Sequence, residues 1–410
     1  MSLIVWECKK IARRRSVQVA LCFALGLALF STIFTGVYNL GSRDSKTGVN
    51  HVDGVAVIAR QDAWADAWKG PLTNEKLAKA MAQYGTAFLP EYEMTFPDGS
   101  IAPSDDAYNT YIAPLGSIPN FVQRTFALLP EYQDMRTLKN LPLSMVADYA
   151  AQRERIVENF LVAQVPSADD RAVFMAQNAA LQKPFVYDWF WGQQVYLELV
   201  SNFALVAAMS LCIALAPIFA GETQQKTDSV LLCTRFGRKK LARAKLLAAM
   251  GITATVYSLC AGIYLTGQWV FVGTRALACP IQIIKPIATA PLTIGQAELY
   301  ALILGFVCCL AVTAVTVALS AKFASPFPVI ILALLFLFLP YTLAGSVPPF
   351  LDKILALLPF GSDYSEVFRT NLYHIFGMRI WSPILVLCMP IAMIVFCLPL
   401  AQHFYIKRQA

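Results

Sequence analysis

The sequence predicts an all-α polytopic membrane protein with six transmembrane helices and one inserted α+β domain that is mostly helical. Three observations support this: an apolar composition, six long windows without charged residues, and a polar segment after the first window. Of the 410 residues, 57% are hydrophobic and 14% are charged, whereas a soluble domain carries roughly 25% charged residues. The bilayer is therefore the expected solvent for much of the chain.

Each window is long enough to cross a membrane, because it has 23 to 29 residues and a spanning helix needs roughly 20 apolar ones. The windows lie between Arg15 and Arg43, Glu198 and Glu222, Lys245 and Arg275, Glu298 and Lys322, Lys322 and Asp352, and Arg379 and Lys407. Since charged residues bound the windows, we expect no Asp, Glu, Lys or Arg inside the spans. This argues against ion-coupled carriers and intramembrane proteases, which retain buried ionisable groups for function.

The first window follows a basic N-terminal stretch and therefore also resembles a secretory signal. Its apolar run, VQVALCFALGLALFSTIF, is longer than the roughly 7 to 15 residues of a signal core and lacks a small-x-small cleavage site. We expect an uncleaved anchor.

Lys and Arg are distributed unevenly between the connecting segments, and short cytoplasmic segments retain positive charge. With the N terminus inside, the inside segments hold 15 Lys and Arg, and the short outside loops hold five. Residues 41–195 then face outward with 13 Lys and Arg against 18 Asp and Glu. We expect a multi-pass plasma membrane protein with both termini cytoplasmic, whose basic flanks meet lipid head groups and not nucleic acid.

Three parts follow from this layout: residues 1–40 with the first span, an extracytoplasmic domain at 41–195, and five further spans in 196–410. In the inserted domain, GVAVIA at 54–59 suits a short strand, and YEMTFPDGSI at 92–101 alternates around a Pro-Asp-Gly turn as a hairpin does. None of the ten cysteines falls in 41–195, which predicts an exported region without disulfides.

Helices are also expected in the inserted domain. Thr73 is placed to cap a helix that carries Leu77, Met81 and Tyr84 on one face, and Ser167-Ala-Asp-Asp has the spacing of a capping box. Another helix is expected from about 144 to 165.

The outside segment from Gly345 to Ile380 is long for a simple turn. Its DKILALL stretch is apolar enough to form a short helix that dips back into the membrane interface, with Pro359 ending it. An ordinary surface loop is the alternative.

Chemistry-bearing motifs are missing from the sequence. His51 and His374 have no neighbouring Cys or acid at metal-ligand spacing, and His403, near the inner end of the last window, is expected to be structural. The adjacent Cys308 and Cys309 are expected to pack as small apolar residues. GRKK at 237–240 lacks the second glycine of a phosphate loop. We expect a non-enzymatic chain without metal or bound cofactor of its own.

The densest charged run, FAGETQQKTDSVLLCTRFGRKKLARAKL at 219–246, separates the second and third spans. Thr227 or Asp228 is placed to cap a short helix with an apolar face, and Gly237 suits its end. The basic residues alone are explained as charge that retains the loop inside. Three consecutive apolar residues held out of the bilayer, Val230 to Leu232, favour docking of a soluble partner.

This stretch, from Ala216 to Ala248, resembles the signature of ABC type-2 exporter permeases. By that resemblance, four parts couple the chain to an ATPase. The acidic residue is Glu222, and the coupling helix contains Asp228, Val230, Leu231 and Leu232. The turn contains Thr234, Arg235, Gly237, Arg238 and Lys239, and the returning lysine is Lys245. WKGPLTNEKLAKAMAQY at 68–84 and KPFVYDWFWGQQV at 183–195 also resemble such permeases from Firmicutes-like bacteria, which insert a domain after the first span.

The resemblance implies a coupling helix at about 222–245, a re-entrant region at about 345–379, and an outer gate shaped by Leu355, Leu358, Pro359 and Phe360. It implies an exporter permease that pairs with itself or a related permease, while a separate ABC ATPase binds ATP and Mg²⁺. The uncharged spans favour an amphiphilic substrate such as a lipid, a peptide or a drug-like molecule. Two alternatives remain open: a force-transmitting or sensing protein that passes no substrate, and a stand-alone channel.

Overall fold

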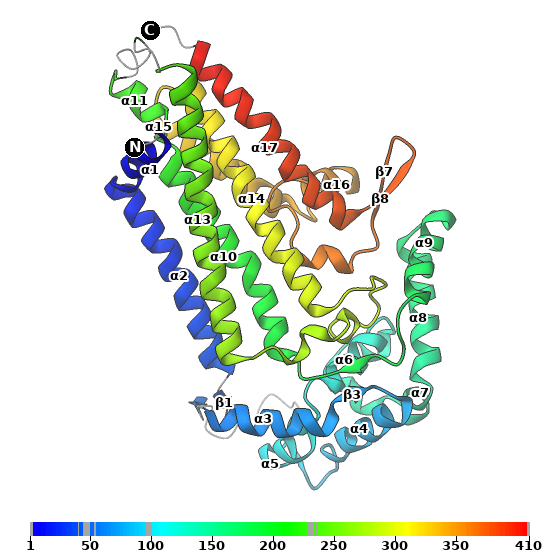
Figure 1. Ribbon diagram of the computed structural model, residues 1–410. Helices are drawn as coiled ribbons and strands as arrows, with labels where there is room; N and C mark the ends of the chain where they lie inside the picture. Colours follow the sequence, from blue (N-terminus) through cyan, green and yellow to red (C-terminus); the bar gives the residue numbers. More distant parts are fainter. Residues whose placement is uncertain are drawn as a thin grey trace.

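The computed structural model describes residues 3–39, 41–43, 50–52, 55–95, 101–227, 233 and 237–407. Within these residues, six helices are long and apolar enough to cross a membrane: α2 (Arg15–Asn39), α10 (Trp191–Leu215), α13 (Lys239–Phe271), α14 (Ile294–Lys322), α15 (Pro326–Leu343) and α17 (Ser382–Lys407). They lie side by side in one bundle (Figure 1). The prediction of six apolar spanning helices is confirmed.

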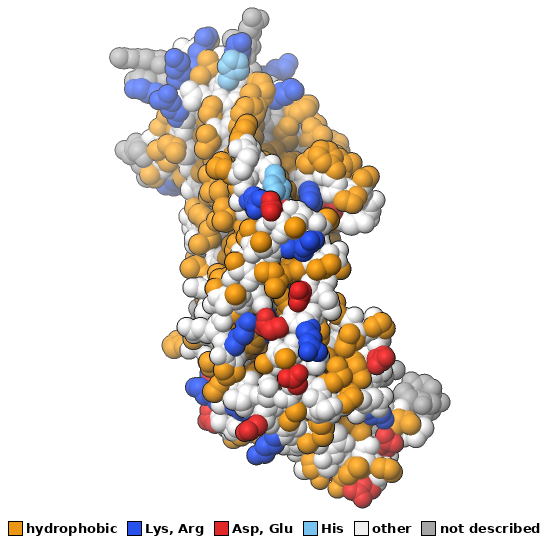
Figure 2. All heavy atoms as spheres, turned by 90° about the vertical axis from the view of Figure 1, so that its right-hand side faces the viewer, with side chains coloured by type: hydrophobic (Ala, Val, Ile, Leu, Met, Phe, Trp, Pro, Cys, Tyr) orange, Lys and Arg blue, Asp and Glu red, His pale blue; other side chains and the backbone are white. Residues whose placement is uncertain are grey.

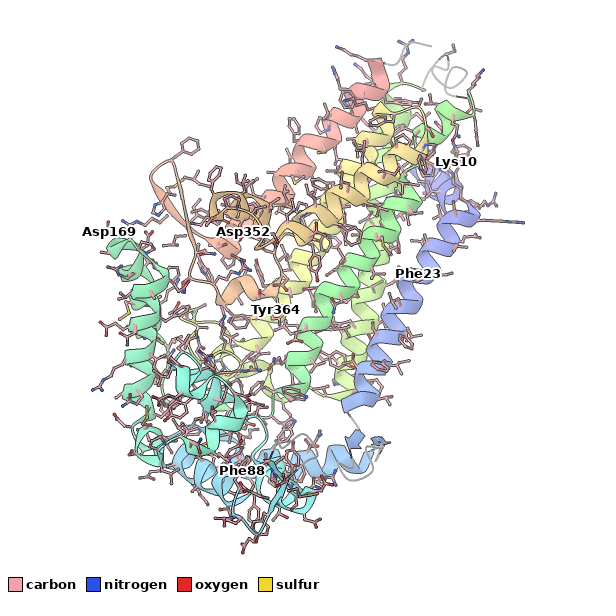
Figure 3. The ribbon with its side chains drawn as sticks, turned by 180° about the vertical axis from the view of Figure 1, so that it is seen from behind. Lys10, Phe23, Phe88, Asp169, Asp352 and Tyr364 are labelled. Carbon is pink, nitrogen blue, oxygen red and sulfur yellow. The ribbon has the colours of Figure 1, made fainter. Side chains whose placement is uncertain are left out.

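The bundle has a buried centre and an apolar periphery. The most apolar windows of α10 and α14 are 72% and 67% buried, against 22% for both α15 and α17, so α10 and α14 form the centre. Large apolar side chains on the outer helices are exposed, such as Phe23 on α2 (Figure 3) and Phe327 on α15. This pattern suits a lipid solvent, because lipid tails are as apolar as these side chains.

Local capping explains where the central helices begin. The Thr293 hydroxyl accepts a hydrogen bond from the Gln296 amide (3.2 Å), and the Gln296 side chain accepts one from the Thr293 amide (2.9 Å). This capping box starts α14. Helix α15 follows Ser325 and has Pro326 in its first position, where the missing N–H of proline costs no hydrogen bond.

Our expectation of spans without charged residues is wrong. Glu298 lies one turn inside α14 and is buried, and its carboxylate accepts hydrogen bonds from Tyr264 (3.2 Å) and Gln268 (3.0 Å) on α13. Glu198 lies inside α10 and Lys245 inside α13. The expectation failed because charges were used as window edges, whereas the helices continue past them.

Residues 55–95 and 101–190 form a second body, the α3–α9 region, at one end of the bundle (Figure 1). Its helices are α3 (Val55–Trp68), α4 (Asn74–Thr86), α5 (Asp105–Ala107), α6 (Ile118–Phe126), α7 (Leu143–Ala147), α8 (Tyr149–Gln164) and α9 (Ala168–Ala179), with a π turn η1 (Tyr108–Ile112) and 3-10 turns η2 (Ala113–Leu115), η3 (Pro130–Tyr132) and η4 (Met135–Asn140). The region is mostly helical, as predicted.

Among the described residues, strands occur only as two-stranded antiparallel pairs. These are β1 (Gly41–Arg43) with β2 (Asn50–Val52), β3 (Gly70–Pro71) with β6 (Val186–Tyr187), β4 (Glu93–Thr95) with β5 (Ile101–Pro103), and β7 (Leu372–Ile375) with β8 (Met378–Trp381). The β4–β5 pair, in which Thr95 faces Ile101, confirms the predicted hairpin strands at 92–101.

Two predicted helix starts are confirmed. The Thr73 hydroxyl accepts a hydrogen bond from the Lys76 amide (3.3 Å) at the start of α4, and the Ser167 hydroxyl accepts one from the Asp170 amide (3.3 Å) at the start of α9. The predicted face of α4, Leu77, Met81 and Tyr84, is buried. Each cap satisfies a backbone N–H that lacks a partner within its helix.

Two other predictions for this region need correction. The strand predicted at 54–59 is wrong, because residues from Val55 onward belong to α3, which buries Ala65 and Trp68. A short apolar run suits either structure, and the alanine-rich continuation favours a helix. The helix predicted from 144 to 165 is divided into α7 and α8 at Asp148.

The connection between α13 and α14, residues 272–293, belongs to the core of the α3–α9 region. Its 3-10 turns η5 (Arg275–Ala278) and η6 (Ile281–Ile283) contribute Ala276, Ile281 and Ile283 to the same hydrophobic cluster as Phe121. Arg153 on α8 is 2% exposed and donates hydrogen bonds to the carbonyls of Pro286 (2.8 Å) and Ala288 (3.5 Å). The region is therefore packed directly onto a loop of the bundle.

A third body fills the space beside α14 and α17. Helix α16 (Pro349–Ala356) and the 3-10 turn η7 (Tyr364–Phe368) precede the β7–β8 hairpin. Tyr364 packs against both the bundle core and the core of the α3–α9 region. The hairpin reaches the tip of α9, where His374 contacts Asp170 (2.9 Å) and Arg379 pairs with Asp169 (2.8 Å; Figure 3).

Candidate functional site

The end of the bundle farthest from the α3–α9 region carries helix α1 (Leu3–Ala12), α11 (Ala220–Gln224) and the start of α13 (Figure 1). We call it the basic end, because Lys and Arg side chains gather there in the space-filling view (Figure 2). The first turn of helix α1 is apolar and exposed, at Leu3, Ile4, Val5 and Trp6, while Glu7 and Ile11 are buried. Such a helix suits the membrane interface.

A buried ion-pair cluster joins three helices at the basic end. Glu222 on α11 is 3% exposed, and one carboxylate oxygen pairs with Lys10 on α1 (2.5 Å). The other oxygen pairs with Lys245 on α13, whose side chain is fully buried. The Lys245 ammonium also donates a hydrogen bond to the carbonyl of Ile218 (3.1 Å). One carboxylate thus balances two cations and connects α1, α11 and α13.

The chain bends at the joint between α10 and α11. Helix α10 ends at Leu215, two residues before Pro217, since a proline inside a helix removes a backbone hydrogen bond. Ser320 on α14 stabilises the bend: its hydroxyl donates to the Ala216 carbonyl (2.6 Å) and accepts from the Phe219 and Ala220 amides (3.0 Å each). These bonds satisfy backbone groups that the bend leaves without helical partners. The joint also fixes the position of Glu222 on the following turn.

The end of α11 is equally well defined. Lys226 has a left-handed backbone (φ 56°), and the amides of Lys226 and Thr227 donate to the carbonyls of Thr223 and Glu222 (3.0 Å each). This is a Schellman motif. The Thr227 hydroxyl also donates to the Glu222 carbonyl (3.2 Å), so Thr227 takes part in ending α11.

Glu7 on α1 lies at the edge of the cluster. It is 2% exposed, and within the described part of the chain one of its oxygens has no hydrogen-bond partner. Burial raises the pKa of the Glu7 carboxyl above its ordinary value, against the opposing effect of Lys245 and Lys10. Glu7 therefore binds a proton more readily than a carboxyl in water.

The returning side of the loop is held by α17. The Tyr405 hydroxyl donates a hydrogen bond to the Gly237 carbonyl (3.3 Å), and its ring packs against Phe219 with centroids 4.7 Å apart. The Lys245 ammonium lies 5.1 Å from the centroid of the Phe219 ring, which adds a cation–π contact. Both sides of the loop between α11 and α13 are thus attached to neighbouring helices.

The structure brings together some of the residues that the sequence indicates for this site. Glu222 and Lys245 form an ion pair, Gly237 is buried, and Arg238 and Lys239 are exposed at the start of α13. The remaining predicted residues, Asp228, Val230, Leu231, Leu232, Thr234 and Arg235, lie outside the described residues.

Sequence reasoning missed several members of the site. In the sequence, Lys10 is only one of several basic residues before the first span, and Ser320 is only a polar residue within an apolar window. Glu7 and Tyr405 carry no local signal that would have indicated their contacts. Each reaches the site from a helix that is distant in the sequence.

The predicted gate residues lie beside the bundle. The predicted short helix is present as α16, and Leu355 is its penultimate residue. Pro359 is buried, Leu358 is half-buried, and Phe360 has a left-handed backbone (φ 63°) and packs against Leu304 and Cys308 of α14. Phe360 therefore lies beside the middle of α14, because Cys308 is 14 residues from the start of this helix, or about 21 Å along its axis at 1.5 Å per residue.

No family model matches the chain, and neither a curated protein nor a solved structure matches it.

Proposed function

We propose that the chain is the membrane-spanning permease subunit of an ATP-driven ABC transporter and exports an amphiphilic substrate. ATP and Mg²⁺ bind to a separate ATPase, which docks on the loop between α11 and α13. The observation that carries this proposal is the Glu222–Lys245–Lys10 cluster, because it ties the start of that loop to α1 and α13.

A force applied to the loop between α11 and α13 acts on several helices at once. Ser320 connects the α10–α11 joint to α14. Tyr405 connects Gly237, at the end of the loop that leads into α13, to α17. Elements that are tightly packed and hydrogen-bonded move as units between discrete arrangements. Movement of the docked ATPase is therefore transmitted to α1, α10, α13, α14 and α17 together.

The proposed orientation places the basic end in the cytoplasm and the α3–α9 region outside the plasma membrane. Positive charge gathered at the basic end favours this orientation. In the spans, Thr253 and Thr313 bond each other (2.8 Å), and Thr316 donates to the Val312 carbonyl (2.8 Å). Because these hydroxyls bond to each other or to the helix backbone, we do not assign them to a substrate pathway within one chain. The substrate pathway is instead proposed to form between two copies of the chain or between this chain and a related permease. The region around α16 and Phe360 then borders its outer gate.

One observation favours a second candidate, a force-transmitting or sensing protein that passes no substrate. The α3–α9 region shares a hydrophobic cluster with residues 272–293, which connect α13 and α14 directly. Arg275 in this connection pairs with Asp62 (2.9 Å) and Asp188 (3.1 Å). Movement of α13 and α14 would therefore move the α3–α9 region.

The test is purification of the tagged chain from its native membrane, with identification of co-purifying proteins and measurement of ATP hydrolysis. We expect a stoichiometric ATPase whose activity falls when Val230, Leu231 and Leu232 are replaced by Ser. The matched control replaces Leu89, Leu128 and Leu143 by Ser, because these exposed apolar residues of the α3–α9 region lie away from both the basic end and α16. Recovery of the chain alone, without ATP hydrolysis, would refute the proposal and favour a channel.

A transport assay separates the two candidates. Movement of a fluorescent amphiphile across reconstituted vesicles only when ATP is present favours the exporter. ATP hydrolysis without movement of a broad panel of amphiphiles, together with changed protease sensitivity of the α3–α9 region, favours the force transmitter.

A further inference from the structure

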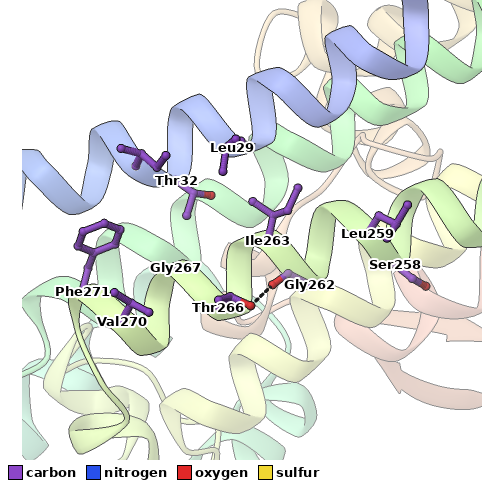
Figure 4. A pocket seen from close by; sticks show the side chains of 11 residues that line it. Leu29, Thr32, Ser258, Leu259, Gly262, Ile263, Thr266, Gly267, Val270 and Phe271 are labelled. Carbon is purple, nitrogen blue, oxygen red and sulfur yellow. Dashed lines mark hydrogen bonds between the residues drawn. The ribbon is translucent and has the colours of Figure 1, made fainter. Parts of the chain in front are cut away.

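An apolar groove runs between α2 and α13 on the outer face of the bundle (Figure 4). Its cavity volume is about 510 Å³. Its lining comes from two turns of α2 and four turns of α13: Leu29, Thr32 and Ile33, and Ser258, Leu259, Gly262, Ile263, Thr266, Gly267, Val270 and Phe271. None of the residues that line it is charged.

The groove is closed at one end by close contact of the two helices. A Cβ atom at Gly267 would collide with the Thr32 side chain, and one at Gly36 would collide with the Phe271 ring. Close approach of this kind is typical of small residues in membrane helices. Away from these contacts the helices diverge, and no atom outside the helix backbone lies within 4 Å of a Cβ built at Gly262. Gly262 therefore forms an open floor.

The polar groups in the groove do not create a polar site. The Thr266 hydroxyl donates to the Gly262 carbonyl (2.7 Å; Figure 4), and the side chain of Thr32 is buried. Ser258, the third hydroxyl residue, is exposed at the end of the lining farthest from Phe271. The rim is apolar and exposed, with Leu29, Leu259 and Val270 exposed by 49%, 52% and 60%. These side chains continue the apolar surface of the bundle, so the groove opens toward the lipid.

The width of the groove distinguishes between occupants. From Ser258 to Phe271 it extends over about 20 Å at 1.5 Å per residue, so its volume of about 510 Å³ corresponds to a mean cross-section near 25 Å². A helix with side chains is 10–12 Å wide and needs roughly 80–110 Å². Packed carbon atoms lie about 4 Å apart, so one hydrocarbon chain needs on the order of 16 Å².

We propose that the α2–α13 groove binds one acyl chain of a phospholipid from the surrounding bilayer. The site lies in the half of the span farther from Lys245, since its lining on α13 begins 13 residues beyond that lysine. The acyl chain lies along Gly262, and the contact between Gly36 and Phe271 closes the end of the groove. This binding does not depend on the proposed ABC coupling.

The experiment uses the full-length chain in liposomes of phosphatidylcholine and phosphatidylglycerol that contain a phosphatidylcholine with a photoactivatable diazirine on one acyl chain. After illumination, labelled peptides are mapped by mass spectrometry. We expect residues 29–33 and 258–271 to be labelled several-fold more than the stretch of α17 from Ile391 to Phe396, whose residues Ile391, Val395 and Phe396 are 46–69% exposed. Equal labelling of the groove and α17 would overturn the proposal.

Filling the groove provides a second measurement. Gly262→Leu is expected to reduce labelling of the groove several-fold and to leave labelling of α17 unchanged. Gly251→Leu is the matched control, because Gly251 lies on the same helix, also has nothing within 4 Å of an added Cβ, and does not line the groove. Groove labelling that is the same in Gly262→Leu and Gly251→Leu would contradict the proposal.

A second copy of the chain is the competing occupant. If it covers the groove, Gly262→Cys forms a disulfide-linked dimer on mild oxidation in the membrane, and the lipid does not label the groove. That combination would also overturn the proposal.

Discussion

Replacing Glu222 by Gln is expected to destabilise the chain more than replacing Lys245 by Met. Without the carboxylate, the fully buried Lys245 ammonium keeps only uncharged direct partners: the Ile218 carbonyl, the Phe219 ring and the amide oxygen introduced at position 222. Removing one partner of a buried ion pair costs about 3–5 kcal/mol of unfolding free energy. Lys245→Met leaves Glu222 paired with Lys10, so the expected cost is about 1.5–3 kcal/mol, the range for losing a hydrogen bond to a charged group.

The double variant distinguishes this explanation from a general loss of packing. Replacing both buried partners by uncharged groups is often close to neutral, and Lys10, 30% exposed at its side chain, can turn toward water. We therefore expect Glu222→Gln with Lys245→Met to cost no more than Glu222→Gln alone, with a coupling free energy of about 2 kcal/mol.

The assay is the free energy of unfolding of the purified chain in mixed micelles, followed by circular dichroism. Glu158→Gln is the control, since Glu158 is an exposed carboxylate on α8 and such surface substitutions change stability by about 0.5 kcal/mol or less. Single costs that add in the double variant, or a neutral Glu222→Gln, would refute the reasoning.

Three further predictions concern other parts of the molecule. Arg153→Met is expected to destabilise the α3–α9 region by about 3 kcal/mol, because Asn178 (2.9 Å) and the carbonyl of Pro286 lose a buried charged donor. The measurement is limited proteolysis, which we expect to be faster at residues 280–290. Unchanged proteolysis would contradict this prediction. Because burial raises the folded pKa of Glu7 above its ordinary value of 4.5, the folded chain binds the proton more tightly than the unfolded chain, and this contribution to stability is lost as pH rises above 4.5. Glu7→Gln should therefore stabilise the chain at neutral pH and have no effect well below pH 4.5; the same effect at both would exclude this cause. Gly267→Ala is expected to cost about 1–3 kcal/mol through collision of the helices, while Gly262→Ala, with open space around its Cβ, is expected to be nearly neutral; equal unfolding free energies would show that the close contact is unimportant.

Several features of this chain can be predicted from short stretches of sequence. The caps at Thr73 and Ser167 are confirmed because a side-chain oxygen bonds an amide only three residues away. The β4–β5 strands are confirmed because a Pro-Asp-Gly sequence separates two alternating stretches. Residues 55–59 were predicted wrongly, because an apolar run this short does not distinguish a strand from the start of a helix.

The candidate site is only partly predictable for a different reason. Glu222 and Lys245 stand out in the sequence as the charged edges of two windows, but their pairing is a contact between separate helices. Lys10 lies 212 residues from Glu222 along the chain, and Ser320 reaches the α10–α11 joint across 104 residues. No local pattern records such contacts.

The sequence alone determined that this chain has six long apolar helices and where several other helices begin, because hydropathy and capping depend on residues within a single helix. Tertiary structure decided which charges are buried together, that Glu298 is enclosed by Tyr264 and Gln268, and that residues 272–293 complete the core of the α3–α9 region. It also decided that α2 and α13 touch at Gly267 and diverge at Gly262. Each of these contacts joins residues that are far apart in the sequence. It therefore forms only when the whole chain packs into its arrangement of lowest free energy.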